Sequence, residues 1–277
     1  MISEAEERLR ATGVELAGWR WIEAGDACDI HFIAGLKAAR GALEGTIESV
    51  DVIVQAAAGR ERRLLVTDMD STVITVECID ELADYAGVRT EVAAITEQAM
   101  RGDLDFAAAL RARVALLRNL DVATVDHCHA ERVRLMPGAT TLVRTMRARG
   151  AYTLLVSGGF TVFADKVAIE IGFDRSTANR LGSADGRLDG TVSEPIVGAA
   201  AKRTALIEAA AEQGVPVAAT LAVGDGANDV PMLEAAGLGV AFRAKPAAEA
   251  AADAVLRHND LSTLLYAQGI PKREWIG

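Results

Sequence analysis

The chain has 277 residues, of which 51% are hydrophobic and 25% are charged, and its formal net charge is −10. These values are typical of a globular protein with one large domain, or with one domain and a smaller second one. An acidic surface repels nucleic acid and anionic lipid, which argues against both as partners and predicts that an anionic substrate needs positive charge near its site.

The cysteine pattern and the first residues bear on where the protein works. Cys28, Cys78 and Cys128 are too few and too widely spaced for a disulfide framework, and they suit a reducing compartment. The first ten residues, MISEAEERLR, lack the apolar segment of a signal peptide. Because no run of about 18 apolar residues could cross a membrane, we expect a cytoplasmic protein.

Residues 1–60 predict a small α+β unit. Their pattern indicates, in order, a helix, two strands, a second helix and a third strand, over residues 3–12, 13–23, 27–33, 35–45 and 50–57. This order of elements resembles a truncated ACT-like fold, an amino-acid-binding fold, with its first strand missing. The polar segment 57–63 predicts a linker, with a domain boundary near residue 60.

From residue 64 onward, short apolar strands alternate with helices. The predicted strands cover residues 64–68, 152–157, 220–225, 237–242 and 252–256. Such a pattern predicts an α/β fold, a doubly wound parallel (Rossmann-like) sheet covered by helices on both faces.

A charged, helical block separates the first two of these strands. It is too long for a crossover, and we interpret it as an inserted cap. The expected division is therefore an N-terminal unit, a catalytic core in two pieces, and a helical cap, covering residues 1–60, 61–76 with 137–277, and 77–136.

Chemically capable residues follow several of the predicted strands. Asp68 and Asp70 follow the first, Ser157 with Gly158 ends the second, and the segment 224–229, GDGAND, follows a later one. In open α/β sheets ligands bind beyond the carboxyl ends of the strands. Taken singly, each motif has an ordinary explanation, such as a helix cap or a turn, and Lys202 could be solvated surface.

Taken together and in this order, these motifs resemble those of the haloacid dehalogenase-like phosphatases over residues 64–260. The matching segments are DMDST (68–72), the strand-ending SGG (157–159), the isolated Lys202 and GDGAND. ECID, an F-x3-LRxRV segment, MPG, VSGGF and GDGANDxPM further resemble the branch that hydrolyses O-phospho-L-serine. Met69 stands where that family often has Phe.

The resemblance implies a two-step phosphate transfer. Asp68 would be the nucleophile that forms an aspartyl-phosphate, and Asp70 would protonate the leaving oxygen and then activate water. Mg²⁺ would be held by Asp68, Asp70 (through its backbone carbonyl) and Asp225, and Asp229 would support the metal or Lys202. The residues expected to bind or balance the phosphate are Ser157, Gly158, Lys202 and Asn228.

The cap would choose the substrate. By resemblance, Glu77 would meet the ammonium group of phosphoserine and Arg113 its carboxylate, while Met100 and Phe106 would close over it. Spacing alone gives Arg113 no such role, because Arg111 and Arg118 lie in the same arginine-rich stretch.

Other functions stay open. A phosphatase of the same family could act on phosphothreonine or a sugar phosphate, and a receiver-like signalling protein would also carry a phospho-acceptor aspartate. A third possibility is an amino-acid sensor built on residues 1–56.

The run Asp126-His-Cys-His129 does not predict a zinc site, since successive helical side chains point in different directions. The oligomeric state, including a homodimer, also stays open.

Overall fold

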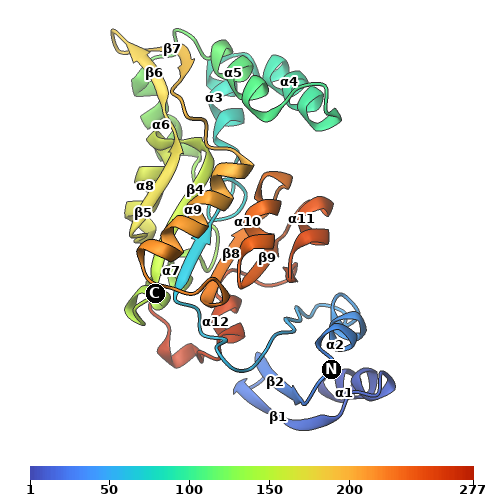
Figure 1. The fold of residues 1–277 in the computed structure, drawn as a ribbon. Coiled ribbons are helices and arrows are strands. Elements are labelled where there is room, and N and C mark those ends of the chain that lie inside the picture. The colour runs from blue at the N-terminus through green and yellow to red at the C-terminus, as the bar shows by residue number, and fades with distance from the viewer.

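A computed structural model describes residues 1–277. Its main sheet has six strands in the order β10-β9-β8-β3-β4-β5 (Figure 1). All neighbouring strands are parallel, which confirms the predicted doubly wound α/β sheet. The strands are β3 (Leu64–Thr67), β4 (Tyr152–Phe160), β5 (Arg175–Asn179), β8 (Thr220–Gly224), β9 (Leu238–Phe242) and β10 (Ala254–Leu256).

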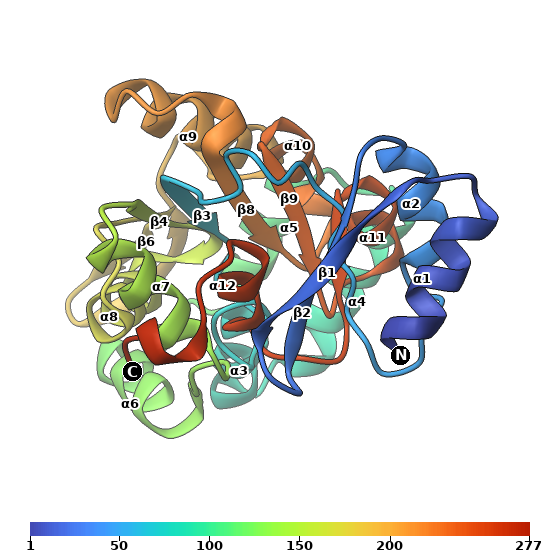
Figure 2. The same cartoon turned by 90° about the horizontal axis from the view of Figure 1, so that it is seen from below.

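Both faces of this sheet are buried because its central strands are apolar on both sides. Leu64 and Val66 belong to a core shared with α9 (Ala199–Glu212), α10 (Val230–Ala235) and α11 (Pro246–Ala251). Leu65 lies in the larger core with α7 (Ala139–Ala148), α8 (Thr161–Ile171) and α12 (Thr263–Ala267). Figure 2 shows α9 and α10 on one side of the sheet and α7 and α12 on the other.

Four helices stand beyond the carboxyl ends of β3 and β4, at the top of Figure 1. They are α3 (Cys78–Ala86), α4 (Arg89–Arg101), α5 (Phe106–Leu116) and α6 (Val122–Arg132). A hairpin of β6 (Leu181–Ala184) and β7 (Arg187–Val192) joins them, since the N–H of Leu188 donates to the carbonyl of Leu120 at 2.8 Å. The sequence pattern missed β5, β6 and β7 because these strands are rich in polar residues and glycine.

The first residues form α1 (Ile2–Ala11), the antiparallel pair β1 (Leu16–Glu23) and β2 (Ala27–Phe32), and α2 (Leu36–Leu43). The strand predicted over 50–57 is wrong, because these residues form no strand. Val50, Val52 and Val54 do pack against the small core of this unit, as their alternation suggests. Their backbone, however, pairs with no strand, so the segment runs extended without joining the sheet.

Side chains around this segment fasten the N-terminal unit to the last part of the chain. The Asp51 carboxylate accepts the backbone N–H groups of residues 257–259 at 2.7 to 3.2 Å. Gln55 donates to the carbonyl of Ala267 at 2.6 Å, and Arg40 to that of Ala252 at 2.5 Å. These bonds span more than 200 residues of sequence and connect the N-terminal unit with the end of the predicted catalytic core. The division into three domains stays a prediction.

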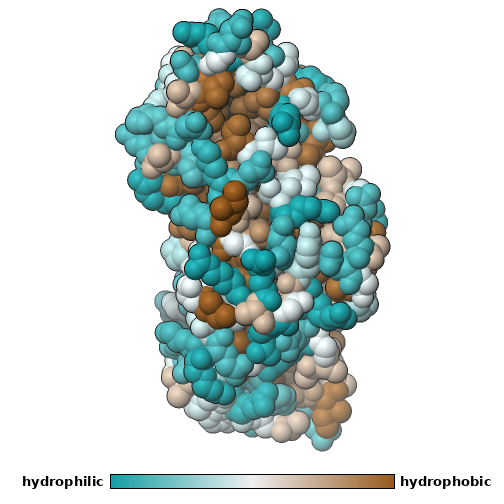
Figure 3. All heavy atoms as spheres, turned by 90° about the vertical axis from the view of Figure 1, so that its left-hand side faces the viewer, coloured by the Kyte–Doolittle hydropathy of each residue, from teal (hydrophilic) through white to brown (hydrophobic).

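The surface is mostly hydrophilic on the side of β5 and α8 (Figure 3). Hydrophobic atoms gather in a hollow near the cap and otherwise stand apart. Ile169, on α8, is an exposed apolar side chain of the kind that most proteins carry. The structure has no helix that combines the length and the apolar character needed to cross a membrane.

Candidate active site

Asp68 and Asp70 lie just beyond β3, at the carboxyl edge of the sheet. The N–H of Asp68 donates to the carbonyl of Val223 in β8 at 2.9 Å, which continues the ladder one residue past the strand. The chain then turns sharply, and Ser71 adopts a left-handed φ of 56°. This turn is local and strained, a feature that concentrates at functional sites.

Lys202 is the buried charge around which the site is organised. It lies in the first turn of α9 and is fully buried. Its Nζ lies 2.7 Å from Asp68 Oδ1 and 2.6 Å from Asp229 Oδ1. Burial alone would lower the pKa of Lys202, but Asp68 and Asp229 hold it above its usual value. The lysine is therefore a fixed cation between two acids.

Asp229 supports the loop that follows β8. Its Oδ2 accepts the backbone N–H groups of Asp225 (3.1 Å) and Gly226 (3.0 Å), while Oδ1 accepts from Lys202. Gly224 permits this packing because a Cβ there would overlap the Asp229 carboxyl group. Both oxygens of Asp229 are therefore already engaged.

A cluster of three carboxylates could hold a metal ion. Oxygens of Asp68, Asp225 and Asp229 all lie within 4.8 Å of one another. Burial, and then the charge of Asp229, raises the pKa of Asp225 to about 6, and Lys245 opposes this shift. Burial and Asp229 also raise the pKa of Asp68, against the effect of Lys202. Since oxygen ligands suit Mg²⁺ and a cation would relieve this repulsion, the donor set fits the ion.

Asp70 keeps an unused oxygen. Its Oδ2 accepts the N–H of Cys78 at 3.4 Å, whereas the buried Oδ1 has no hydrogen-bond partner. Burial, and then the charge of Glu77, raises the pKa of Asp70 to about 7. A carboxyl group that titrates near neutral pH can both give and take a proton, as a general acid and base must. Unsatisfied buried polar atoms are rare, which makes this one informative.

The end of β4 brings its motif against these acids. A Cβ added at Gly159 would lie 3.0 Å from Ser157 Oγ and 3.1 Å from Asp70 Oδ2. Ser157 is buried, and its Oγ accepts the N–H of Gly159 at 2.8 Å. At Gly158 a Cβ would lie 3.1 Å from the Phe106 ring at the start of α5. The structure therefore brings together Asp70, Ser157, Gly158 and Phe106.

Other predicted cap residues are less tightly grouped. Glu77 Oε1 accepts from the Ser71 hydroxyl at 2.7 Å, which links it to the turn after β3. Arg113 is half-buried, and burial lowers its pKa, whereas the charges of Asp80 and Glu77 oppose this shift. Its Nη1 donates to Thr96 Oγ1 at 3.4 Å. Met100 is 77% exposed near the end of α4, and no described contact joins it to the aspartates.

Two further residues lie near the carboxyl ends of β8 and β9. Asn228 is half-buried in the short helix Ala227–Asp229 that follows Gly226. Lys245 follows β9, and its Nζ lies 3.9 Å from Asp225 Oδ2. Sequence reasoning missed Lys245. A signal was available, since a lysine directly before Pro246 occupies a helix N-cap, where a cation is unfavourable.

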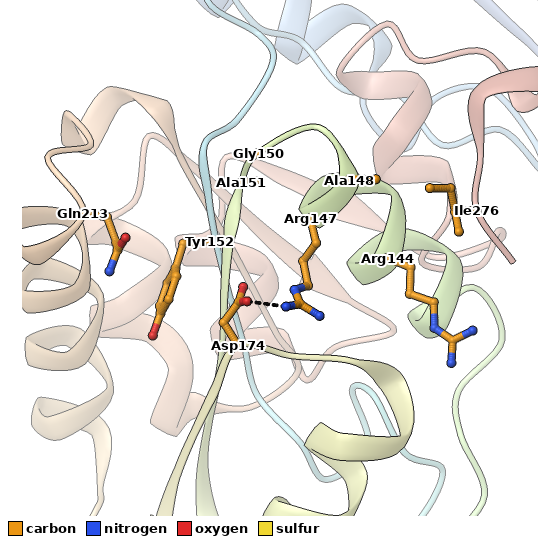
Figure 4. Close-up of a pocket in the computed structure, with 9 residues that line it drawn as sticks. All are labelled: Arg144, Arg147, Ala148, Gly150, Ala151, Tyr152, Asp174, Gln213 and Ile276. Atoms are coloured by element: carbon orange, nitrogen blue, oxygen red, sulfur yellow. Dashed lines mark ion pairs between the residues drawn. The ribbon is translucent and has the colours of Figure 1, made fainter.

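Two cavities lie away from these residues. One of about 500 Å³ opens at the opposite edge of the sheet, beside Arg144, Arg147, Tyr152 and Asp174 (Figure 4). Arg147 pairs there with Asp174 at 2.7 Å and donates to the carbonyl of Gly172. The other, about 620 Å³, lies between the N-terminal unit and residues 259–275. Neither contains a predicted site residue.

Comparison with known proteins gives consistent matches. Residues 65–234 match a family described as haloacid dehalogenase-like hydrolase. A phosphoserine phosphatase of Streptomyces coelicolor is 48% identical over 84% of this chain and 57% of its own length. One of Polaromonas sp. is 45% identical over 73% of this chain and 88% of its own. A substrate-bound phosphoserine phosphatase structure superposes with a TM-score of 0.70 at 38% identity, covering 74% of this chain and 98% of that one.

Proposed function

The chain belongs to the haloacid dehalogenase-like hydrolase family, and from this premise we propose that it hydrolyses O-phospho-L-serine to L-serine and phosphate, a step of serine biosynthesis. The chain spans little more than half the length of its relative from Streptomyces coelicolor, so the activity of the whole protein is part of the proposal. The observation that carries it is the buried Lys202 between Asp68 and Asp229, next to Asp70 with its unpaired oxygen.

Asp68 is the proposed nucleophile. The charge of Lys202, at 2.7 Å, favours the anionic form that attack on phosphorus requires. Attack forms a bond from the Asp68 carboxylate to phosphorus and breaks the bond from phosphorus to the serine oxygen. Asp70 gives its proton to the departing oxygen, and its carboxylate then takes a proton from the water that cleaves the aspartyl-phosphate.

Fixed donors hold the phosphate during both steps. The Ser157 hydroxyl, the backbone N–H of Gly158, Lys202 and Asn228 are the proposed donors. Mg²⁺ held by the carboxylates of Asp68 and Asp225 and the carbonyl of Asp70 would supply charge that offsets the repulsion between nucleophile and phosphate. Asp229, with both oxygens engaged, keeps Lys202 and the 225–226 backbone in place.

The cap supplies the proposed contacts to the amino-acid part of the substrate. Arg113 offers a planar pair of donors to a carboxylate, and Glu77 offers an acceptor to an ammonium group. One positive and one negative side chain suit the zwitterionic amino-acid part of phosphoserine, which a sugar phosphate lacks. Phe106 covers Gly158 and would exclude water, whereas Met100 would need to move inward to reach the substrate.

A substrate panel tests the proposal. Phosphate release is measured from O-phospho-L-serine, O-phospho-L-threonine and a sugar phosphate, with Mg²⁺ and then with EDTA. We expect the fastest release from phosphoserine and none of it in EDTA. A preference for the sugar phosphate would overturn the substrate and keep the family chemistry. A lasting phosphate on Asp68 without turnover would favour the receiver-like signalling protein.

The proposed location is the cytoplasm, where such an enzyme would meet its substrate. The three cysteines, Cys28, Cys78 and Cys128, are all unpaired, which suits a reducing compartment.

A further inference from the structure

Lys245 lies at the rim of the candidate active site, and the mechanism proposed above does not use it. It stands between β9 and α11, at the same sheet edge as Asp225. Its side chain is 63% exposed, with Nζ 3.9 Å from Asp225 Oδ2. Its backbone N–H also donates to the carbonyl oxygen of Asp225 at 2.8 Å. Both its main chain and its side chain therefore face one acid of the cluster.

The helix that follows gives no reason for a lysine at this position. Lys245 is the N-cap of α11, and Pro246 begins the helix. N-caps favour side chains that accept hydrogen bonds, and the positive end of the helix dipole disfavours a cation. The Asp225 carboxylate is the neighbour that compensates for this unfavourable placement.

The charge balance of the site gives a reason. Asp68, Asp70, Asp225 and Asp229 bring carboxylates to this edge, and the buried Lys202 pairs with Asp68 and Asp229 only. The chain as a whole carries a net charge of −10, which repels a phosphate monoester. An exposed cation beside this cluster would counter both effects.

We propose that Lys245 is an electrostatic positioning residue, which holds Asp225 until a divalent cation binds and afterwards adds positive charge for the phosphate group. The effect of Lys245 on the phosphate group rests on the proposed function. Its effect on the divalent cation depends only on its contact with Asp225. Lys245 repels a divalent cation and attracts an anion. Its removal should therefore change the two affinities in opposite directions, whereas loss of a residue that merely supports the loop would weaken both.

The experiment compares full-length variants by calorimetry, first with Mg²⁺ alone and then with inorganic phosphate on the Mg²⁺-saturated protein. Lys245→Gln removes the charge, Lys245→Glu reverses it, and Lys245→Arg keeps it. Lys37→Gln, an exposed lysine of α2 in the N-terminal unit, is the matched control for net charge. Steady-state assays with phosphoserine give KM and kcat for each variant.

For Lys245→Gln we expect the Mg²⁺ Kd to fall and the phosphate Kd to rise, each by about two- to fivefold, as for an exposed ion pair. KM should rise more than kcat changes. The Glu variant should shift further in both directions, and the Arg variant and Lys37→Gln should match wild type.

Three results would overturn the inference: weakening of both affinities, no change in the Gln and Glu variants, or an Arg variant that behaves like Gln. Failure of wild type to hydrolyse phosphoserine would instead overturn the proposed function, because neither calorimetric titration uses that substrate.

Discussion

The two ends of the strands in the central sheet, its amino edge and its carboxyl edge, both carry basic side chains and aspartate, yet they differ in how these groups are paired. At the amino edge, Arg144 and Arg147 donate to backbone carbonyls at the end of α8 and to Asp174, around a cavity of about 500 Å³. At the carboxyl edge, acids crowd around Lys202 and one oxygen of Asp70 has no partner. The amino edge therefore has a cavity whose charged groups are paired, whereas the carboxyl edge has buried charge that is not balanced.

The sharpest test of this contrast makes the same substitution at both edges. Asp68→Asn should reduce phosphoserine turnover at least on the order of 1,000-fold, because an amide is a poor nucleophile toward phosphorus. Asp174→Asn should leave turnover within a factor of about two, because that side chain only pairs with its neighbours. Steady-state phosphate release measures both. Comparable losses would end the functional distinction between the edges.

A second test removes the buried cation. Lys202→Met should destabilise the fold by about 3–5 kcal/mol, because Asp68 and Asp229 are left buried without their partner. Urea unfolding in EDTA measures the loss, with Lys202→Arg as the variant that keeps the charge. Mg²⁺ should restore part of the lost stability if the cluster binds it. Equal stability of Lys202→Met and wild type would mean that these acids are protonated in the folded chain.

A third test asks whether the cap belongs with the carboxyl edge. Arg113→Ala should lower kcat/KM for phosphoserine by about 10- to 100-fold through loss of a charged contact to its carboxylate. A phosphomonoester without a carboxylate, such as phosphoethanolamine, should lose far less. Arg111→Ala, on the same helix and paired with Glu194, is the matched control. Equal losses on both substrates would remove Arg113 from substrate selection.

The smallest effect concerns the stability of the amino edge. Asp174 accepts the N–H and hydroxyl of Thr153, both at 2.9 Å, and pairs with Arg147. Because these groups are partly exposed, Asp174→Asn should cost only about 1 kcal/mol of unfolding free energy. Thermal unfolding with and without Mg²⁺ should show the same small loss. A change in Mg²⁺ affinity would instead couple the two edges.

The central residues of the candidate site could be predicted because they lie in short contiguous motifs at the ends of strands. Asp68 with Asp70, and Asp225 with Asp229, each lie within five residues of one another, and a parallel sheet necessarily brings its strand ends together. The pairing of Lys202 with Asp68 could not be read from spacing, since 134 residues separate them (202 minus 68). Arg113 and Glu77 were identified only by resemblance, and their roles stay predictions.

The errors have a common physical source. Residues 50–57 alternate like a strand, and their valines do face a core, but strand formation needs a pairing partner that periodicity does not report. The strand β5 is an outermost strand of the main sheet, and β6 and β7 form a separate hairpin. All three contain polar residues and lack the apolar run of a buried strand. Lys245 could be noticed as an unfavourable helix N-cap, but its contact with Asp225, 20 residues earlier (245 minus 225), could not be read from the sequence.

The bonds from Asp51, Gln55 and Arg40 to residues 252–267 also set an order of events during synthesis. The N-terminal unit is translated before the segment that it contacts, since its bonds reach residues 212 positions later in the chain. This unit has a buried core of only five residues, so we expect it to have little stability until its contacts with residues 252–267 can form. Docking of this unit would then have to follow translation of residues 252–267, and a nascent chain stalled before residue 252 would leave the unit accessible to proteases.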